Sequence, residues 1–194
     1  MDPYCIEDCT KWDIPHTSWT LQGYSVAGKR TGFIIPSLNI LLDAGVNCRK
    51  TPKNILVTHS HSDHSFYLPC IAMDRHSKLV DKPVVYCPKE MVEPLQLMAR
   101  ASQSLNDCRP LYPDNQIICN GIVGGDSFLI NVKKRRIKIT VCTCSHTVPT
   151  VGYIISEEQK KLKNKYKHLS GKEISKLIKN GITVTDSVDC TRIA

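Results

Sequence analysis

The chain has 194 residues, with 26 Lys and Arg against 18 Asp and Glu, a formal net charge of +8 and 41% apolar side chains. This composition excludes a chain that is disordered along most of its length, and no apolar run reaches the about 18 residues that a membrane span needs. We therefore expect a globular protein that buries its own core. The positive charge favours a polyanionic partner such as RNA.

The first twenty residues contain four acidic side chains, no basic start and no apolar stretch, so we expect no secretory signal. A cytoplasmic, reducing location follows as an expectation, with the nucleus or an organelle left open. The ten cysteines contain no CxxC pair, and we interpret most of them as reduced core residues.

Strands and helices alternate along the chain after an irregular opening segment. Apolar runs with β-propensity predict strands at residues 25–26, 31–35, 38–42, 53–58, 83–87, 126–130 and 137–144. The first of these strands suggest a hairpin around Gly28 and Pro36. Helical periodicity predicts helices at 67–77 and 90–104. Without repeats or low-complexity linkers, the sequence predicts one α/β domain of the α+β type over residues 1–194.

Residues 157–181 stand apart because they hold eight lysines against three glutamates, an excess of five positive charges. We interpret this segment as a basic insertion within the domain. Phosphate contacts of RNA are one use for such lysines, and a solvated helix face is the alternative.

A dense set of metal-binding residue types follows the buried strand at 53–58. In His59-Ser60-His61-Ser62-Asp63-His64, three imidazoles and a carboxylate fall within six residues. Alternation along an extended segment would point His59 and His61 to one side, while Asp63 and His64 begin the next turn. Nitrogen and oxygen donors without thiolates favour a catalytic zinc site that keeps a position for water.

Two more candidates follow other strands. His146 lies just past the strand at 137–144, and with His59 and His61 it would complete a three-histidine zinc site suited to hydrolysis. Asp43 could hydrogen-bond a ligating histidine and fix its tautomer, although an ordinary turn aspartate fits the spacing equally well.

The motif His59-Ser60-His61-Ser62-Asp63-His64 resembles the HxHxDH signature of the metallo-β-lactamase superfamily. Three further stretches, residues 65–69, 146–153 and 161–187, are similar to the short, plant-like form of the tRNase Z (ribonuclease Z) family. The resemblance covers roughly Gly23 to Ser187, and the joint occurrence of these pieces is far more specific than HxHxDH alone.

The resemblance implies a zinc-dependent endoribonuclease that removes the 3′ trailer from precursor tRNA by phosphodiester hydrolysis. It implies two Zn²⁺ ions per active site, the first bound by three histidines and the second by Asp63 and His64, with Asp63 also accepting the proton and Asp43 supporting the ligands. The histidines of the first site would be His59, His61 and His146. RNA binding would fall to the lysine-rich segment, namely to Lys160, Lys161, Lys163, Lys165 and Lys167.

The same resemblance implies an αββα sandwich, and here the sequence departs from the pattern. The Gly-Asp-Thr motif with the bridging aspartate and the last histidine of the second site do not occur, so we expect a sandwich that is incomplete in its second half. An apolar face of the first sheet would then be exposed unless a second copy, in a homodimer, or a complementing chain covers it. Two alternatives to the active enzyme follow: an impaired or split relative that binds tRNA or a partner chain, and a metallo-hydrolase acting on a small substrate.

Overall fold

The computed structural model describes residues 4–73, 82–133 and 135–193. The chain divides into two compact units, the first comprising Met1–Asp126 and Thr140–Tyr153 and the second Ser127–Ile139 and Ile154–Ala194. The single domain expected over residues 1–194 stays a prediction. Within the described part of the chain, none of the helices combines the length and apolar character needed to cross a membrane.

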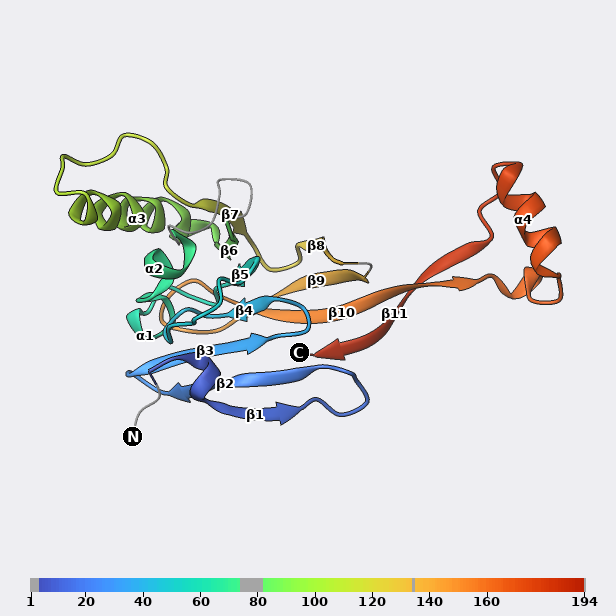
Figure 1. The fold of residues 1–194 in the computed structure, drawn as a ribbon, viewed down its shortest axis with the longest axis horizontal. Coiled ribbons are helices and arrows are strands. Elements are labelled where there is room, and N and C mark those ends of the chain that lie inside the picture. Colours follow the sequence, from blue (N-terminus) through green and yellow to red (C-terminus); the bar gives the residue numbers. More distant parts are fainter. Residues whose placement is uncertain (1–3, 74–81, 134, 194) are drawn as a thin grey trace. The chain divides into compact units, whose positions relative to one another are not determined.

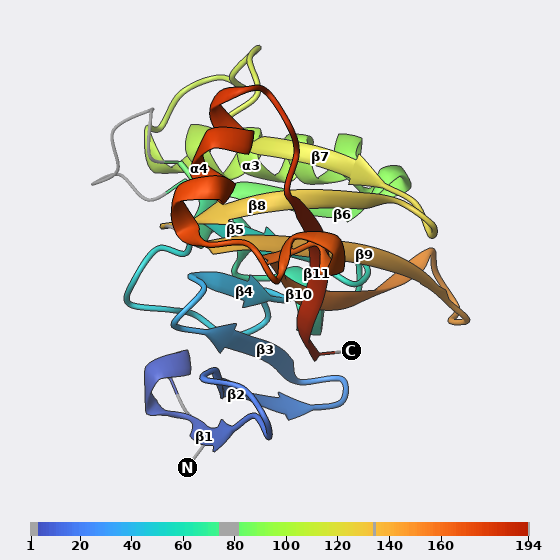
Figure 2. The same ribbon diagram turned by 90° about the vertical axis from the view of Figure 1, so that its right-hand side faces the viewer.

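The first unit is built on a seven-stranded sheet with the strands in chain order, β1 to β7 (Figures 1 and 2). Strands β1 to β4 pair antiparallel, and β4 to β7 pair parallel. The strands are β1 Thr10–Asp13, β2 Thr20–Val26, β3 Arg30–Ile35, β4 Ile40–Leu42, β5 Asn54–Leu56, β6 Val84–Pro88 and β7 Ile118–Ile122. The parallel half places the ends of β5, β6 and β7 at the same edge of the sheet.

Helices of the first unit precede β1, in the case of η1, or lie at the crossovers of the parallel half of the sheet. They are the 3₁₀ helices η1 Ile6–Asp8 and η3 Lys89–Met91 and the α-helices α1 Ser62–Ser65, α2 Leu68–Ala72 and α3 Val92–Asn106. Helix α3 buries Leu95 and Ala99, which are four residues apart and therefore share one face. These side chains join a core cluster with Leu41, Ile55 and Val85 of the central strands.

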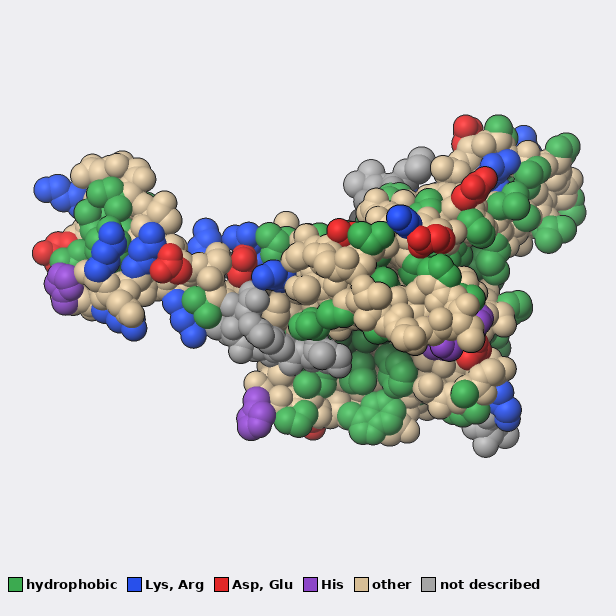
Figure 3. All heavy atoms as spheres, turned by 180° about the vertical axis from the view of Figure 1, so that it is seen from behind, with side chains coloured by type: hydrophobic (Ala, Val, Ile, Leu, Met, Phe, Trp, Pro, Cys, Tyr) green, Lys and Arg blue, Asp and Glu red, His purple; other side chains and the backbone are tan. Residues whose placement is uncertain are grey.

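The second unit contains the strands β8 Ser127–Val132 and β11 Thr185–Ile193, the 3₁₀ helix η4 Asn164–Tyr166 and α4 Gly171–Lys179. Strands β9 Arg135–Cys144 and β10 Thr150–Leu162 contribute residues to both units, and the four-stranded sheet has the order β11-β10-β9-β8. Ser170 caps α4 in a capping box, in which its side chain accepts from the Glu173 N–H and the Glu173 carboxylate accepts from the Ser170 N–H. Figure 3 shows Lys and Arg side chains gathered over this part of the chain.

Most predicted elements are confirmed, and with them the mixed α/β class. A β2–β3 hairpin turns at Gly28, which has φ +68°, and η3 and α3 together cover the predicted helix at 90–104. The helix predicted at 67–77 is found as α2, and residues 74–77 lie outside the described residues. The prediction that the opening segment is irregular is wrong, because β1 pairs with β2 from Thr10 to Asp13. All four side chains of β1 are exposed, so no apolar pattern marks it.

The expectation of an exposed apolar face on the first sheet is wrong for the central strands. Ile35, Ile40 and Leu56 have no exposed surface, and their neighbours Ile34, Leu41 and Ile55, which point to the other face, are buried as well. Exposed apolar surface is found instead at the edge strand β7, where Ile118 is 45% exposed.

Candidate metal centre

The histidine-rich loop begins where β5 ends. Beyond Leu56, the Val57 N–H donates to the Tyr86 carbonyl, and the Thr58 carbonyl accepts from the Val151 N–H at 3.0 Å. The Tyr153 hydroxyl donates to the Val57 carbonyl at 2.7 Å, which ties the start of β10 to the end of β5. These bonds bring the 144–150 loop, which carries His146, next to the loop that carries His59.

Three histidines form one cluster at this point. The ligand atoms of His59, His61 and His146 all lie within 4.8 Å of one another, and His61 Nδ1 is 3.3 Å from His146 Nε2. Two nitrogens bound to one tetrahedral zinc at about 2.05 Å would be separated by about 3.3 Å. The donor set therefore fits zinc in type and number, and the His61–His146 pair also fits it in spacing. His59 is buried whereas His146 is exposed, so the cluster is open on one side for a further ligand.

Asp43 forms hydrogen bonds that connect it to two of the histidines. This residue has φ +57°, a left-handed conformation that Asp tolerates better than most residues. Its carboxylate accepts from the Thr58 N–H at 2.7 Å, from the Thr58 hydroxyl at 3.0 Å and from His64 Nδ1 at 2.8 Å. The Thr58 hydroxyl is also 2.9 Å from His59 Nδ1.

This network assigns both tautomers. An ionised carboxylate only accepts hydrogen bonds, so His64 Nδ1 must carry the proton that reaches Asp43. The Thr58 hydroxyl has a single proton, and because it donates that proton to Asp43 it must accept the Nδ1 proton of His59. In its neutral form, each ring then leaves Nε2 unprotonated, which is the atom that an imidazole offers to a metal.

The pKa values of the two histidines shift in opposite directions. Burial lowers the pKa of His59, and the nearby imidazoles of His64, His61 and His146 add to this effect while Asp43 opposes it. The hydrogen bond with Asp43 raises the pKa of His64 against the opposing effect of its burial. The lowered pKa keeps His59 neutral at pH 7, the state in which imidazole binds a metal.

Gly45 lets the histidine-rich loop pack closely on β4. A Cβ built on Gly45 would lie 1.6 Å from the carbonyl oxygen of Asp63 and 2.7 Å from that of Thr31, so no side chain fits. On either side, the Ala44 N–H donates to the His64 carbonyl and the Gly45 N–H to the Thr31 carbonyl. The segment 43–45 therefore fixes both the backbone and the side chains of the histidine-rich loop.

Asp63 and His64 form a separate pair. Asp63 Oδ2 is 3.6 Å from His64 Nε2 and also accepts from the Gly28 N–H of the β2–β3 turn at 3.1 Å. Among residues 4–73, 82–133 and 135–193, the one cluster of three ligands found is that of His59, His61 and His146. The predicted second site is thus represented by two ligands.

The predicted RNA-binding lysines lie in the second unit, along the end of β10 and within or next to η4. Lys160, Lys161, Lys165 and Lys167 are exposed. Lys163 is half-buried, and its Nζ lies 3.7 Å from Asp186 Oδ1. The sequence does not single out Thr58, although its hydroxyl connects Asp43 with His59. The sequence marks Thr58 only as a polar residue at the end of an apolar strand.

Comparison with known proteins links the chain to one group of enzymes. No family model matches the chain. Of the curated proteins, tRNase Z TRZ2, chloroplastic, from Arabidopsis thaliana is 30% identical over 183 residues, which cover 91% of this chain and 48% of that protein. The resemblance to tRNase Z is confirmed. A second relative, tRNase Z TRZ1 from the same plant, is 28% identical and covers 91% of this chain and 61% of that protein.

Nuclear ribonuclease Z from Triticum aestivum is 29% identical over 176 residues, which cover 88% of this chain and 93% of that protein. The chain therefore spans about half the length of the first relative and most of this one. The names place one tRNase Z relative in the chloroplast and another in the nucleus, so a cytoplasmic location stays a prediction.

Two solved structures are also similar. The metallo-beta-lactamase fold protein YhfI from Bacillus subtilis gives a TM-score of 0.44 at 13% identity, covering 69% of this chain and 53% of that chain. Human tRNase Z, short form (ELAC1), gives a TM-score of 0.38 at 17% identity, covering 74% of this chain and 60% of that chain. The relationship to tRNase Z rests on the sequence matches.

Proposed function

We propose that this chain is a zinc-dependent endoribonuclease of the tRNase Z type, which hydrolyses a phosphodiester of precursor tRNA to release the 3′ trailer. The observation that carries the proposal is the cluster of His59, His61 and His146, in a chain similar to tRNase Z over nine-tenths of its length. The corresponding fold is the αββα sandwich of the metallo-β-lactamase superfamily.

Each residue of the centre has a proposed role. His59, His61 and His146 would hold one zinc ion, and Asp63 with His64 would contribute to a second. Bound there, zinc supplies Lewis acidity toward water and phosphate oxygens. Asp63 accepts the proton of the attacking water, and the Gly28 N–H holds its carboxylate in place. Asp43 orients His64 directly and His59 through Thr58.

Zinc content and trailer cleavage test this proposal together. The purified chain should bind zinc by elemental analysis and release the trailer from a precursor tRNA only when zinc is supplied. His61→Ala should abolish both properties, because it removes one of three ligands. The matched control is His16→Asn, which changes an exposed histidine with φ +59°, a conformation that Asn tolerates. Zinc binding and cleavage that survive in His61→Ala would refute the proposed centre.

A second candidate function is an impaired relative that binds tRNA but needs a second copy or a complementing chain for cleavage. The observation in its favour is that Asp63 and His64 stand as a pair, without a third ligand in the part of the chain that the structure describes. In this case the isolated chain binds one zinc and precursor tRNA but cleaves only after a partner is added. Robust turnover by the isolated monomer, measured alongside its mass by light scattering, would exclude this candidate.

RNA binding is proposed for the lysine-rich segment 157–181. Lys161→Ala and Lys165→Ala should weaken tRNA binding and its dependence on salt. The log–log slope of affinity against salt concentration should fall by about 0.7 to 0.9 for each phosphate that the variant no longer neutralises. Cleavage of a small phosphodiester should be unchanged in both variants. If the chain hydrolyses the small ester but neither binds nor cleaves tRNA, the small-substrate hydrolase is the correct function.

A further inference from the structure

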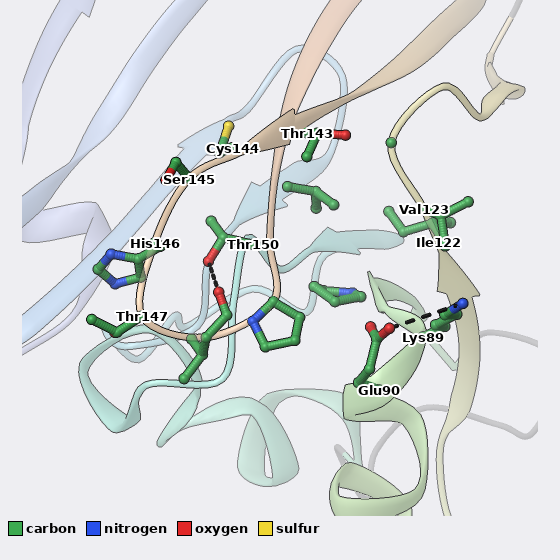
Figure 4. A pocket seen from close by; sticks show the side chains of 15 residues that line it. Lys89, Glu90, Ile122, Val123, Thr143, Cys144, Ser145, His146, Thr147 and Thr150 are labelled. Atoms are coloured by element: carbon green, nitrogen blue, oxygen red, sulfur yellow. Dashed lines mark hydrogen bonds and ion pairs between the residues drawn. The ribbon is translucent and has the colours of Figure 1, made fainter.

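A cavity of about 470 Å³ lies in the first unit beside His146. Its walls come from three segments that follow strands, namely residues 143–151 after β9, 88–90 after β6 and 122–124 after β7. Figure 4 shows the 145–150 loop on one side of the cavity, with Lys89 and Glu90 facing it. Because His146 belongs both to this wall and to the three-histidine cluster, the cavity adjoins the metal centre.

The lining combines groups that suit a nucleotide. Pro149 and Val123, which is 40% exposed, offer apolar surface against which a base can pack. The Lys89 side chain is 65% exposed, and its Nζ forms an ion pair with Glu90 Oε1 at 4.0 Å. An exposed ion pair of this length is weak, so a phosphate can compete for the ammonium group. Thr147 adds a hydroxyl that can meet a ribose.

The walls of the cavity are held in place without a ligand. A Cβ built on Gly124 would lie 1.9 Å from Thr143 Oγ1, so the end of β7 packs directly on β9. The Val123 N–H donates to the Asp126 carboxylate at 2.8 Å. On the other side, a Cβ on Gly121 would lie 3.0 Å from the Lys89 Cα. Close packing of this kind lowers the ordering cost of binding.

We propose that this cavity is a binding subsite for one nucleotide of the RNA strand next to the scissile phosphate, with its phosphate on Lys89 and its base edge toward Glu90. The inference rests on the proposed function, since the neighbouring centre is there assigned to RNA cleavage. Glu90 accepts hydrogen bonds, so it favours bases that donate from the Watson–Crick edge, such as the amino groups of cytosine and guanine.

Cys144 provides a direct probe, because it lines the cavity and is exposed. Alkylation of the native protein by iodoacetamide, followed by mass spectrometry, measures its protection by 5′-CMP, by cytidine and by inorganic phosphate. We expect 5′-CMP at millimolar concentration to slow alkylation of Cys144 at least fivefold and the other two probes to have little effect. Cys108 is an internal control, since it is exposed but lies beyond α3.

Two variants make the test specific. Lys89→Gln should weaken 5′-CMP protection by about tenfold, the loss expected for a charged hydrogen bond. Lys11→Gln should leave protection unchanged, because β1 lies at the opposite edge of the sheet from β7. Equal protection in Lys89→Gln and the wild type, or equal protection of Cys108, would overturn the subsite.

Failure of the subsite and failure of the proposed function give different results. Lys89-dependent protection in a protein that does not cleave precursor tRNA keeps the nucleotide subsite and refutes the cleavage activity. Cleavage by the wild type with unchanged kinetics in Lys89→Gln, and with no protection of Cys144, refutes the subsite alone.

Discussion

The substitution Gly45→Ala should uncouple the histidine-rich loop from the sheet. The new Cβ would lie 1.6 Å from the Asp63 carbonyl oxygen, and real Cβ contacts essentially never fall below 3.0 Å, so the two segments must separate by at least 1.4 Å. Metal ligands tolerate displacements of about 0.2 Å. The atoms in the way are backbone atoms, which cannot move aside by a change of rotamer.

The size of the effect follows from this displacement. Overpacking of a buried position costs about 1–3 kcal/mol, and breaking the Ala44–His64 backbone hydrogen bond adds about 1 kcal/mol. We therefore expect the free energy of unfolding, measured by urea titration without metal, to fall by about 2–4 kcal/mol. Zinc affinity, measured by competition with a chelating dye, should fall by about 10- to 100-fold, as it does when other groups that support metal ligands are removed.

Gly171→Ala is the matched control for Gly45→Ala. Gly171 is the first residue of α4, and nothing lies within 4 Å of a Cβ built on it. Alanine there should leave the free energy of unfolding unchanged or raise it by less than about 1 kcal/mol. A Gly45→Ala protein that matches Gly171→Ala in both stability and zinc affinity would refute the argument that close packing of the 43–45 segment builds the centre.

Three further predictions concern other contacts. Tyr153→Phe removes the hydroxyl that ties β10 to the end of β5, and it should lower the free energy of unfolding in urea by about 1–2 kcal/mol. Ser170→Ala removes the side-chain bond that lowers the pKa of Glu173, so that pKa, followed by carbonyl NMR, should move back toward its ordinary value. Glu173 contributes to the free energy of unfolding above its pKa in the unfolded chain, and this contribution is lost as the pH falls through its pKa in the folded chain. The contribution should be smaller in Ser170→Ala. The hydrogen bond with the Cys119 thiol and burial both raise the pKa of Cys87, so iodoacetamide should modify Cys87 far more slowly than Cys144.

The sequence predicts the parts of the fold whose burial leaves a pattern. The strand before the histidine-rich loop is a short apolar run, and β5 buries every residue from Asn54 to Leu56. Strand β1 is not predicted because all its side chains are exposed, and it is held mainly by its backbone pairing with β2. Pairing of this kind leaves no periodicity to detect.

The ligands of the metal centre also differ in how far the sequence alone predicts them. The segment from His59 to His64 is local, and its residue types alone indicate a metal site. His146 lies 85 residues beyond His61 in the chain, and bonds such as that from Val151 N–H to the Thr58 carbonyl bring them together. The walls of the cavity beside His146 come from three segments that are far apart in the chain, so nothing in the sequence around Lys89 and Glu90 indicates the cavity.

Asp43 explains why the two predicted metal positions would respond together. Its carboxylate accepts a hydrogen bond from His64 Nδ1 directly. It also accepts the single hydroxyl proton of Thr58, so that His59 must donate from its own Nδ1 to the Thr58 oxygen. One charge at the end of β4 thus sets the ligand atom of a histidine in the three-histidine cluster and of a histidine in the Asp63 pair. Since Gly45, two residues on, holds the backbone of the same loop, the 43–45 segment fixes both the chemical state and the position of the ligands.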